Sequence, residues 1–182
     1  MYQTGEYVVY GKLGVCTVAD CREREAPDSG VRQLYYTLVP CFEHGMKVYA
    51  PVDNNKVPIH PMLTEDQAQE LLRLIPFIRG GGEHARDLDV LTEQCAARLS
   101  FSGREELIER LLILYGRRAA VQELRRRKGP GRMPAAREVR TALFNELGIA
   151  LHVSAQEAAR MAERAAQPAP TCPGAAPAAV NE

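Results

Sequence analysis

The chain has 182 residues, of which 46% are hydrophobic and 25% are charged, and its formal net charge at pH 7 is zero. These values predict a soluble protein with one or two small domains, and they exclude a uniformly basic or acidic chain. Because no apolar stretch is long enough to span a membrane and no charged-then-apolar leader opens the sequence, we expect a cytoplasmic protein without a membrane partner.

The first part of the chain has the alternation and turn residues of short β-strands. Residues 7–10 and 15–18 are rich in β-branched and aromatic side chains, and the loop between them holds Gly11 and Gly14, which predicts a tight hairpin. The charged residues 21–32, with Pro-Asp-Ser-Gly near their centre, are typical of a turn-rich stretch.

Further strands are predicted at residues 34–39, 46–52 and about 56–59. In the second of these, alternation places Met46 on a buried face and the neighbouring Lys47 on a wet one. A sheet of about five short strands avoids exposed edge strands best when it closes into an SH3-like or Tudor-like β-barrel. We therefore expect a barrel domain over residues 1–62.

The pattern becomes helical at residue 64. Thr64 and Gln67 form a capping box for a helix that Pro76 is expected to end, and three glycines follow at residues 80–82. Glycine is costly inside a helix, so residues 63–79 are predicted to form a connecting helix and linker.

Residues 80–166 are predicted to form an all-α domain. Apolar stripes and caps indicate a helix from Leu88 to about residue 100, a long helix from the capping box at Ser102 to about residue 128, and a third over residues 135–147 that ends at Gly148. Ser154 opens a short last helix. Residues 167–182, rich in Pro and Ala, are predicted to be disordered. The fold class is thus α+β with two domains.

No motif indicates an enzyme, a cofactor or a metal. The five cysteines include no Cys-x-x-Cys pair, and Cys16 and Cys95 are expected to be small core residues. The four histidines have no acidic or cysteine partner at ligand spacing, and no phosphate loop or nucleophile elbow is present. We therefore predict no catalytic residues.

A basic segment is the clearest candidate site in the helical part. Residues 117–140 hold nine Lys and Arg side chains but two acidic ones. Arginine forks suit phosphate oxygens, and clustered cations gain affinity by counterion release. A solvated face that favours the helix dipole is the alternative. We predict contact with a nucleic-acid backbone, without sequence specificity, through Arg117, Arg118, Arg125, Arg126, Arg127, Lys128 and Arg132.

Four segments together resemble the CarD-type transcriptional regulators, whose N-terminal module also occurs in the transcription-repair coupling factor. They are residues 5–10, Gly14-Val15, Tyr35-Tyr36-x-Leu38 and residues 46–54. The helical part is similar in layout to about residue 150, with Leu114-Tyr115-x-Arg117-Arg118 where the family carries a basic helix.

The resemblance implies a bacterial protein whose Tudor-like domain docks on the β subunit of RNA polymerase and whose helical domain touches promoter DNA. By position, Arg24 and Tyr49 fall where the family presents polymerase-contacting side chains, and Arg22 and Lys47 lie beside them on polar positions. Some members carry arginine in place of Tyr49. The implied function is a monomeric regulator that changes the lifetime of the open complex.

One departure concerns DNA opening. Several family members insert a tryptophan into the DNA minor groove. Unstacking the bases costs free energy, which is offset because the inserted side chain stabilises the opened DNA. This chain has no tryptophan, and the matching region is Gly80-Gly81-Gly82-Glu83-His84. Two alternatives stay open: an adaptor whose helical domain binds another protein and not DNA, and a barrel associated with RNA or the ribosome.

Overall fold

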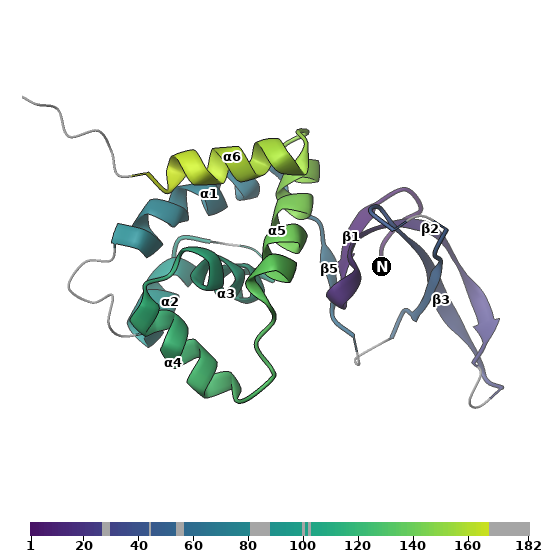
Figure 1. Ribbon diagram of the computed structural model, residues 1–182. Helices are drawn as coiled ribbons and strands as arrows, with labels where there is room; N and C mark the ends of the chain where they lie inside the picture. The colour runs from purple at the N-terminus through teal and green to yellow at the C-terminus, as the bar shows by residue number, and fades with distance from the viewer. Residues whose placement is uncertain are drawn as a thin grey trace, which may run out of the picture.

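The computed structural model describes residues 1–26, 30–43, 45–53, 57–80, 88–99, 101 and 103–167. The strands gather on one side of the molecule and the helices on the other (Figure 1). We refer to residues 1–61 as the sheet half and to residues 65–167 as the helical half. No helix in the described part of the chain has both the length and the apolar character needed to cross a membrane.

The sheet half is one antiparallel sheet of five strands in the order β4-β3-β2-β1-β5. The strands are β1 (Tyr7–Tyr10), β2 (Gly14–Glu25), β3 (Arg32–Pro40), β4 (Val48–Pro51) and β5 (Ile59–Pro61). The opening hairpin is confirmed, because β1 pairs with β2 across a short 3-10 turn. The edge strands β4 and β5 do not pair with each other among the described residues, so hydrogen bonding leaves the sheet open.

The predicted turn-rich stretch at residues 21–32 is mostly strand. β2 continues to Glu25 and pairs with β3, which places Arg22 opposite Tyr35 and Arg24 opposite Gln33. An antiparallel ribbon accepts these charges because one of its faces stays in water. Of the predicted turn at residues 27–30, residues 27–29 lie outside the described part of the chain.

The core of the sheet half forms on one face of the strands. Its buried members are Val8, Tyr10, Cys16, Val18, Tyr36, Leu38 and Ala50. Met46 is not among them: it precedes β4 and is 41% exposed, so the prediction of a buried Met46 is wrong. The strand begins only at Val48, and the alternation of the strand does not extend back to Met46.

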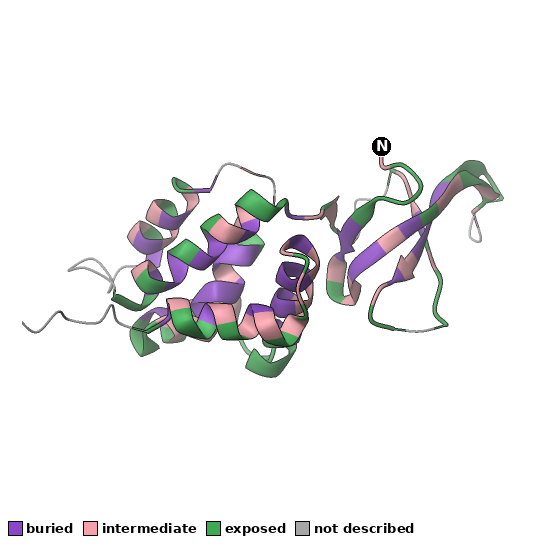
Figure 2. Cartoon of the chain, turned by 90° about the horizontal axis from the view of Figure 1, so that it is seen from above, coloured by how far each residue is buried: buried purple, intermediate pink, exposed green. Residues whose placement is uncertain are grey.

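The helical half contains α1 (Glu65–Gly80), α2 (Leu88–Ala96), α3 (Arg104–Tyr115), α4 (Arg118–Lys128), α5 (Ala136–Ala150) and α6 (Ala155–Ala165). Their apolar faces turn inward, as the buried residues in Figure 2 show. A single large cluster runs from Leu63 to Ala166 and includes the inner faces of α1, α3 and α5.

The capping box at α1 is confirmed, but α1 does not end at Pro76. The amide of Gln67 donates to Thr64 Oγ1 at 3.3 Å, and the amide of Thr64 donates to Gln67 Oε1 at 2.9 Å. The helix continues to Gly80, with Ile75 and Ile78 fully buried on either side of the exposed Pro76. Proline removes one helical hydrogen bond, and here it does so on the solvent side, where water can replace the lost donor.

The predicted long helix over residues 104–128 is two helices. The chain leaves α3 at Gly116, whose amide donates to Leu112 O at 2.8 Å. A Cβ at Gly116 would lie 2.3 Å from that carbonyl oxygen, so only glycine fits this exit. The N-cap of α3 is Gly103, which provides no side-chain hydrogen bond, and Ser102 lies outside the described residues.

Gly148 is not a C-terminal cap, because α5 continues to Ala150. A Cβ at Gly148 would lie 3.0 Å from the backbone of both Val153 and Ala155. The glycine instead lets the turn into α6 approach α5 closely. The N-cap of α6 is confirmed: Ser154 Oγ accepts from the amide of Glu157 at 3.1 Å.

The two halves meet where α5 packs against β2. Val9 and Val15, which are cross-strand partners, are buried but belong to neither core cluster. On β5, His60 Nε2 lies 3.9 Å from Glu106 Oε2 of α3. A chain of polar contacts therefore begins at this junction and continues into the helical half through the ion pairs of Arg110 with Glu106 and Glu146.

Candidate functional site

The structure brings Arg24 of β2 and Tyr49 of β4 together on the outer face of the sheet. The guanidinium carbon of Arg24 lies 4.1 Å from the centre of the Tyr49 ring, which is a cation–π contact. Tyr49 is 49% exposed, so the far side of its ring faces solvent. The register explains the shared face, because Tyr49 lies opposite Thr37 and Thr37 lies opposite Asp20, two positions from Arg22 and four from Arg24.

The two other residues predicted for this surface have different surroundings. Arg22 is largely exposed and its Nε forms an ion pair with Asp20 on the same strand. Lys47 is exposed just before β4. Arg24 and Tyr49 thus form a pair, whereas Lys47, just before the edge strand, has no ion-pair partner among the residues that the structure describes.

β4 adds features that the sequence did not reveal. It pairs with β3 on one side only, so its outer edge carries unpaired backbone groups among the described residues. Phe42 and Met46, in the connection from β3 to β4, are 48% and 41% exposed. The sequence indicated this exposure of Phe42 and Met46 only by placing large apolar residues in a loop that contains glycine. Apolar side chains, an aromatic ring and an open strand edge therefore lie in the same region of the sheet.

The basic segment contains fewer free charges than its composition indicates. Arg126 and Arg127 both bind Glu123, through Nε–Oε contacts of 2.9 Å, and Arg127 also binds Asp89 of α2. Lys128 Nζ lies 2.6 Å from Glu109 Oε1 of α3. Hydrogen bonds from the arginines lower the pKa of Asp89 and of Glu123 from their ordinary values. Three of the seven predicted DNA contacts thus fix α4 to its neighbours or to itself.

Arg117 also has a structural role. Its Nε donates to the carbonyl of Arg79 at 3.3 Å and its Nη2 donates to the carbonyl of Gly80. These are carbonyls of the last turn of α1, which have no partner within their own helix. Arg117 therefore caps α1 from the start of α4, a contact that the sequence could not have indicated.

Arg118, Arg125 and Arg132 are exposed and form no ion pair within the described part of the chain. Arg118 and Arg125 are seven residues apart on α4, so they lie on the same side of the helix at a separation of about 10 Å along its axis. Among the seven predicted DNA contacts, these three arginines are the cations most available to an anionic partner.

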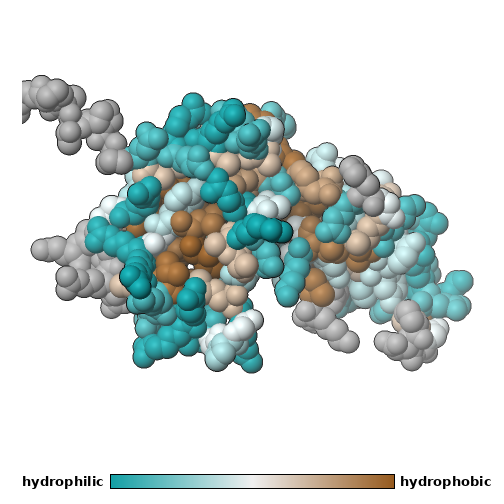
Figure 3. All heavy atoms as spheres, viewed as in Figure 1, coloured by the Kyte–Doolittle hydropathy of each residue, from teal (hydrophilic) through white to brown (hydrophobic). Residues whose placement is uncertain are grey.

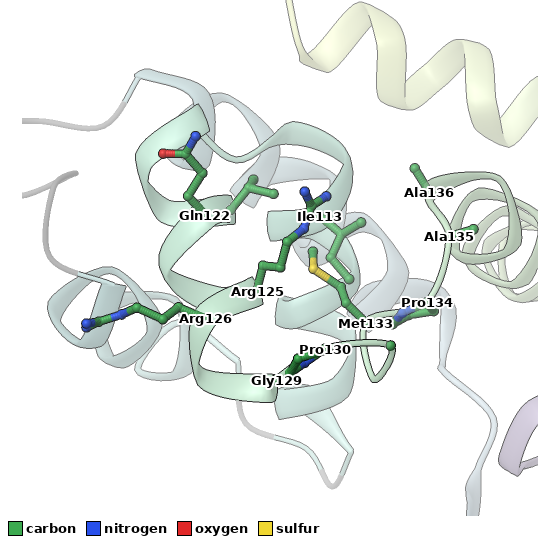
Figure 4. A pocket seen from close by; sticks show the side chains of 12 residues that line it. Ile113, Gln122, Arg125, Arg126, Gly129, Pro130, Met133, Pro134, Ala135 and Ala136 are labelled. Carbon is green, nitrogen blue, oxygen red and sulfur yellow. The ribbon is translucent and has the colours of Figure 1, made fainter.

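Next to Arg125 is a groove of about 800 Å³. It lies between α3, α4 and the segment that leads into α5 (Figure 4). Figure 3 shows hydrophobic side chains gathered over α3 and bordered by hydrophilic ones. No group of three metal-ligating side chains occurs among the described residues.

Comparison with known proteins identifies the sheet half. Residues 2–63 match the family model described as the CarD-like/TRCF RID domain. The match covers all five strands and ends just before α1. No curated protein matches the chain.

Proposed function

Residues 2–63 are a CarD-like/TRCF RID domain, and from this premise we propose that the protein is a non-enzymatic transcription regulator that binds bacterial RNA polymerase. In this proposal the sheet half, an SH3-like or Tudor-like domain, docks on the β subunit, and the helical half contacts promoter DNA. The complex changes the lifetime of the open promoter. Such a regulator acts as a monomer in the cytoplasm, where polymerase is found.

The observation that carries the docking proposal is the Arg24–Tyr49 pair beside the open edge of β4. An exposed edge can accept a strand from a partner, with affinity from main-chain hydrogen bonds and specificity from nearby side chains. Here Arg24 of β2 and Tyr49 of β4 provide a cation and an aromatic ring on the outer face of the sheet, and Lys47 adds a positive charge just before β4. Arg22 stays on the surface as part of its pair with Asp20.

For DNA contact, the free arginines Arg118, Arg125 and Arg132 support the proposal most strongly. Arg126, Arg127 and Lys128 are already neutralised by Glu123, Asp89 and Glu109, and Arg117 caps α1. These four side chains would add to the positive electrostatic field around α4, but they would not each bind a phosphate. Weak, nonspecific contact can suffice, because docking on polymerase raises the effective concentration of DNA near the helical half.

The proposed anchor is tested by recovering RNA polymerase on immobilised full-length protein. The double variant Arg24→Ala/Tyr49→Ala should recover about tenfold less polymerase than wild type, since it removes an aromatic and an arginine anchor. The control is Lys12→Ala/Tyr7→Ala, which removes a cation and a half-exposed tyrosine near the other edge of the same sheet. It should recover polymerase as wild type does. Equal recovery by both double variants would overturn the anchor assignment.

A second candidate function is an adaptor whose helical half binds another protein and not DNA. The pairing of Arg126, Arg127 and Lys128 favours it, because paired cations release few counterions on binding DNA. Binding of duplex DNA by the full chain separates the two functions. If the full chain has no measurable affinity for duplex DNA at low salt, DNA contact is excluded and the adaptor function remains.

A further inference from the structure

The groove beside Arg125 has no part in the docking surface of the sheet half. It has walls from α3, α4 and the start of α5, and its volume is about 800 Å³ (Figure 4). That volume is enough to enclose one or two large side chains of a ligand. Its apolar lining comes from Ile113, Val121, Met133, Pro134, Ala135 and Ala136.

The charge of the groove is positive. Arg125 extends across it toward Ile113, whereas Arg126 points away and is held by Glu123 (Figure 4). Among the described residues that line the groove there is no aspartate or glutamate. The first turn of α5 opens at the same place, and its N-cap Ala135 offers no side-chain hydrogen bond to the free backbone amides. The positive end of the helix dipole adds to the field of Arg125, and Glu138 in the same first turn opposes it in part.

We propose that this groove binds a short acidic segment of a partner protein, with a large apolar side chain of the segment between Ile113 and Met133 and a carboxylate on Arg125. Amphipathic segments commonly bind in this way, with apolar anchors in a groove and charges at its rim. DNA fits less well, because its phosphates would contact Arg125 and leave the apolar walls uncovered. The inference does not depend on polymerase docking by the sheet half.

The binding test uses fluorescence anisotropy with the full chain and a dye-labelled synthetic peptide. The probe has about twelve residues, with Leu and Phe at helical spacing among Asp and Glu, as a groove-binding helix requires. We expect saturable binding that weakens at least about tenfold when Leu and Phe are replaced by Ser, since the apolar walls then lose their ligand. No saturable binding, or equal binding of the Ser peptide, would overturn the proposal.

Two variants place the probe in the groove. Ala136→Glu puts an acidic side chain at the rim, and it suits the first turn of α5 because acidic residues are favourable there, so the fold should be retained. Arg125→Glu reverses the cation that faces Ile113. Each should weaken probe binding by about tenfold or more, through loss of charge complementarity. Thermal unfolding followed by circular dichroism checks that both variants are folded.

The matched control is Arg118→Glu, which makes the same charge change on the same helix but outside the groove. It should weaken probe binding by less than about threefold, since it alters only the general field. If Arg118→Glu is as damaging as Arg125→Glu, or if Ala136→Glu has no effect, the peptide binds a diffuse basic surface and the proposal is wrong. DNA binding reports separately, because Arg118 is a proposed phosphate contact outside the groove, so Arg118→Glu should weaken DNA binding while it spares probe binding.

Discussion

Glu146 is 1% exposed, and its environment makes the stability of the protein depend on pH. Its Oε2 accepts from Arg110 Nη1 at 3.0 Å, while its Oε1 has no hydrogen-bond partner within the described part of the chain. Burial raises the pKa of Glu146, and Arg110 and His60 oppose this only in part. Arg110 is itself shared with Glu106, which lies 2.5 Å away. A carboxylate with half of its hydrogen bonds unmade is costly to ionise in the folded state.

The sign of the pH effect follows from the raised pKa. Because folding favours the protonated form of Glu146, this stabilising contribution is present at acidic pH and is lost as pH rises through the folded-state pKa. Glu146→Gln cannot titrate. We therefore expect the free energy of unfolding of Glu146→Gln, relative to wild type, to increase from acidic to neutral pH in urea titrations. A difference that falls with pH would mean that Arg110 dominates and lowers the pKa instead.

Two thiols should differ from the others in reactivity. Cys16 and Cys95 are fully buried, as expected from the sequence, and burial raises the pKa of each to about 11. Cys21 and Cys41 are only partly buried. Since the thiolate is the reactive form, a thiol reagent at neutral pH should modify Cys21 and Cys41 at least about tenfold faster than Cys16 and Cys95. Peptide mass spectrometry measures the order in which the four thiols are modified, and the difference in their modification rates should disappear in denaturant.

At the scale of elements, two helical glycines have opposite roles that one experiment can separate. A Cβ at Gly148 would press on the backbone of Val153 and Ala155 at 3.0 Å, whereas a Cβ at Gly80 would meet no described residue within 4 Å. Gly148→Ala should therefore destabilise the protein by about 1–3 kcal/mol, although alanine favours helix by about 1 kcal/mol. Gly80→Ala is the control and should be neutral or slightly stabilising. Chemical unfolding of both variants measures the difference, and a stabilising Gly148→Ala would show that α5 and α6 can move apart.

The elements that the sequence predicted correctly are those with a local cause. Alternation predicted β1 and the start of β2, and the side chains of Thr64 and Gln67 alone were enough to locate the start of α1. The errors concern elements that tertiary packing decides. Pro76 lies on the exposed side of a helix whose other side is held by the core, and Gly148 is needed only because the turn into α6 approaches α5.

The same distinction applies to the site residues. The sequence shows that basic residues are dense between positions 117 and 140, but it does not show their partners. Asp89 is 38 residues from Arg127, and the carbonyls of Arg79 and Gly80 are 38 and 37 residues from Arg117. The contact between Arg24 and Tyr49 likewise requires the sheet to form first. Composition could therefore predict a basic surface and not the number of its free charges.

At the scale of the whole molecule, that number decides how strongly DNA binding should depend on salt. The logarithm of the binding constant falls with the logarithm of salt concentration with a slope of about −0.9 for each phosphate neutralised. Seven free cations would give a slope of about −6, whereas Arg118, Arg125 and Arg132 alone would give about −3. We expect the lower value for the full chain on a short duplex, measured by anisotropy over a salt series.

A single substitution on α4 tests this reasoning. Glu123→Gln removes the negative charge that pairs with Arg126 and that is one of the two carboxylate partners of Arg127, without changing any basic residue. Because Arg126 then becomes available to phosphate, the slope should steepen by about one unit and DNA affinity should rise. Glu163→Gln is the control, since it releases Arg140 at a pair on α5 and α6 that is remote in sequence from α4. An unchanged slope for Glu123→Gln would mean that the ion pairs of α4 already open when DNA binds.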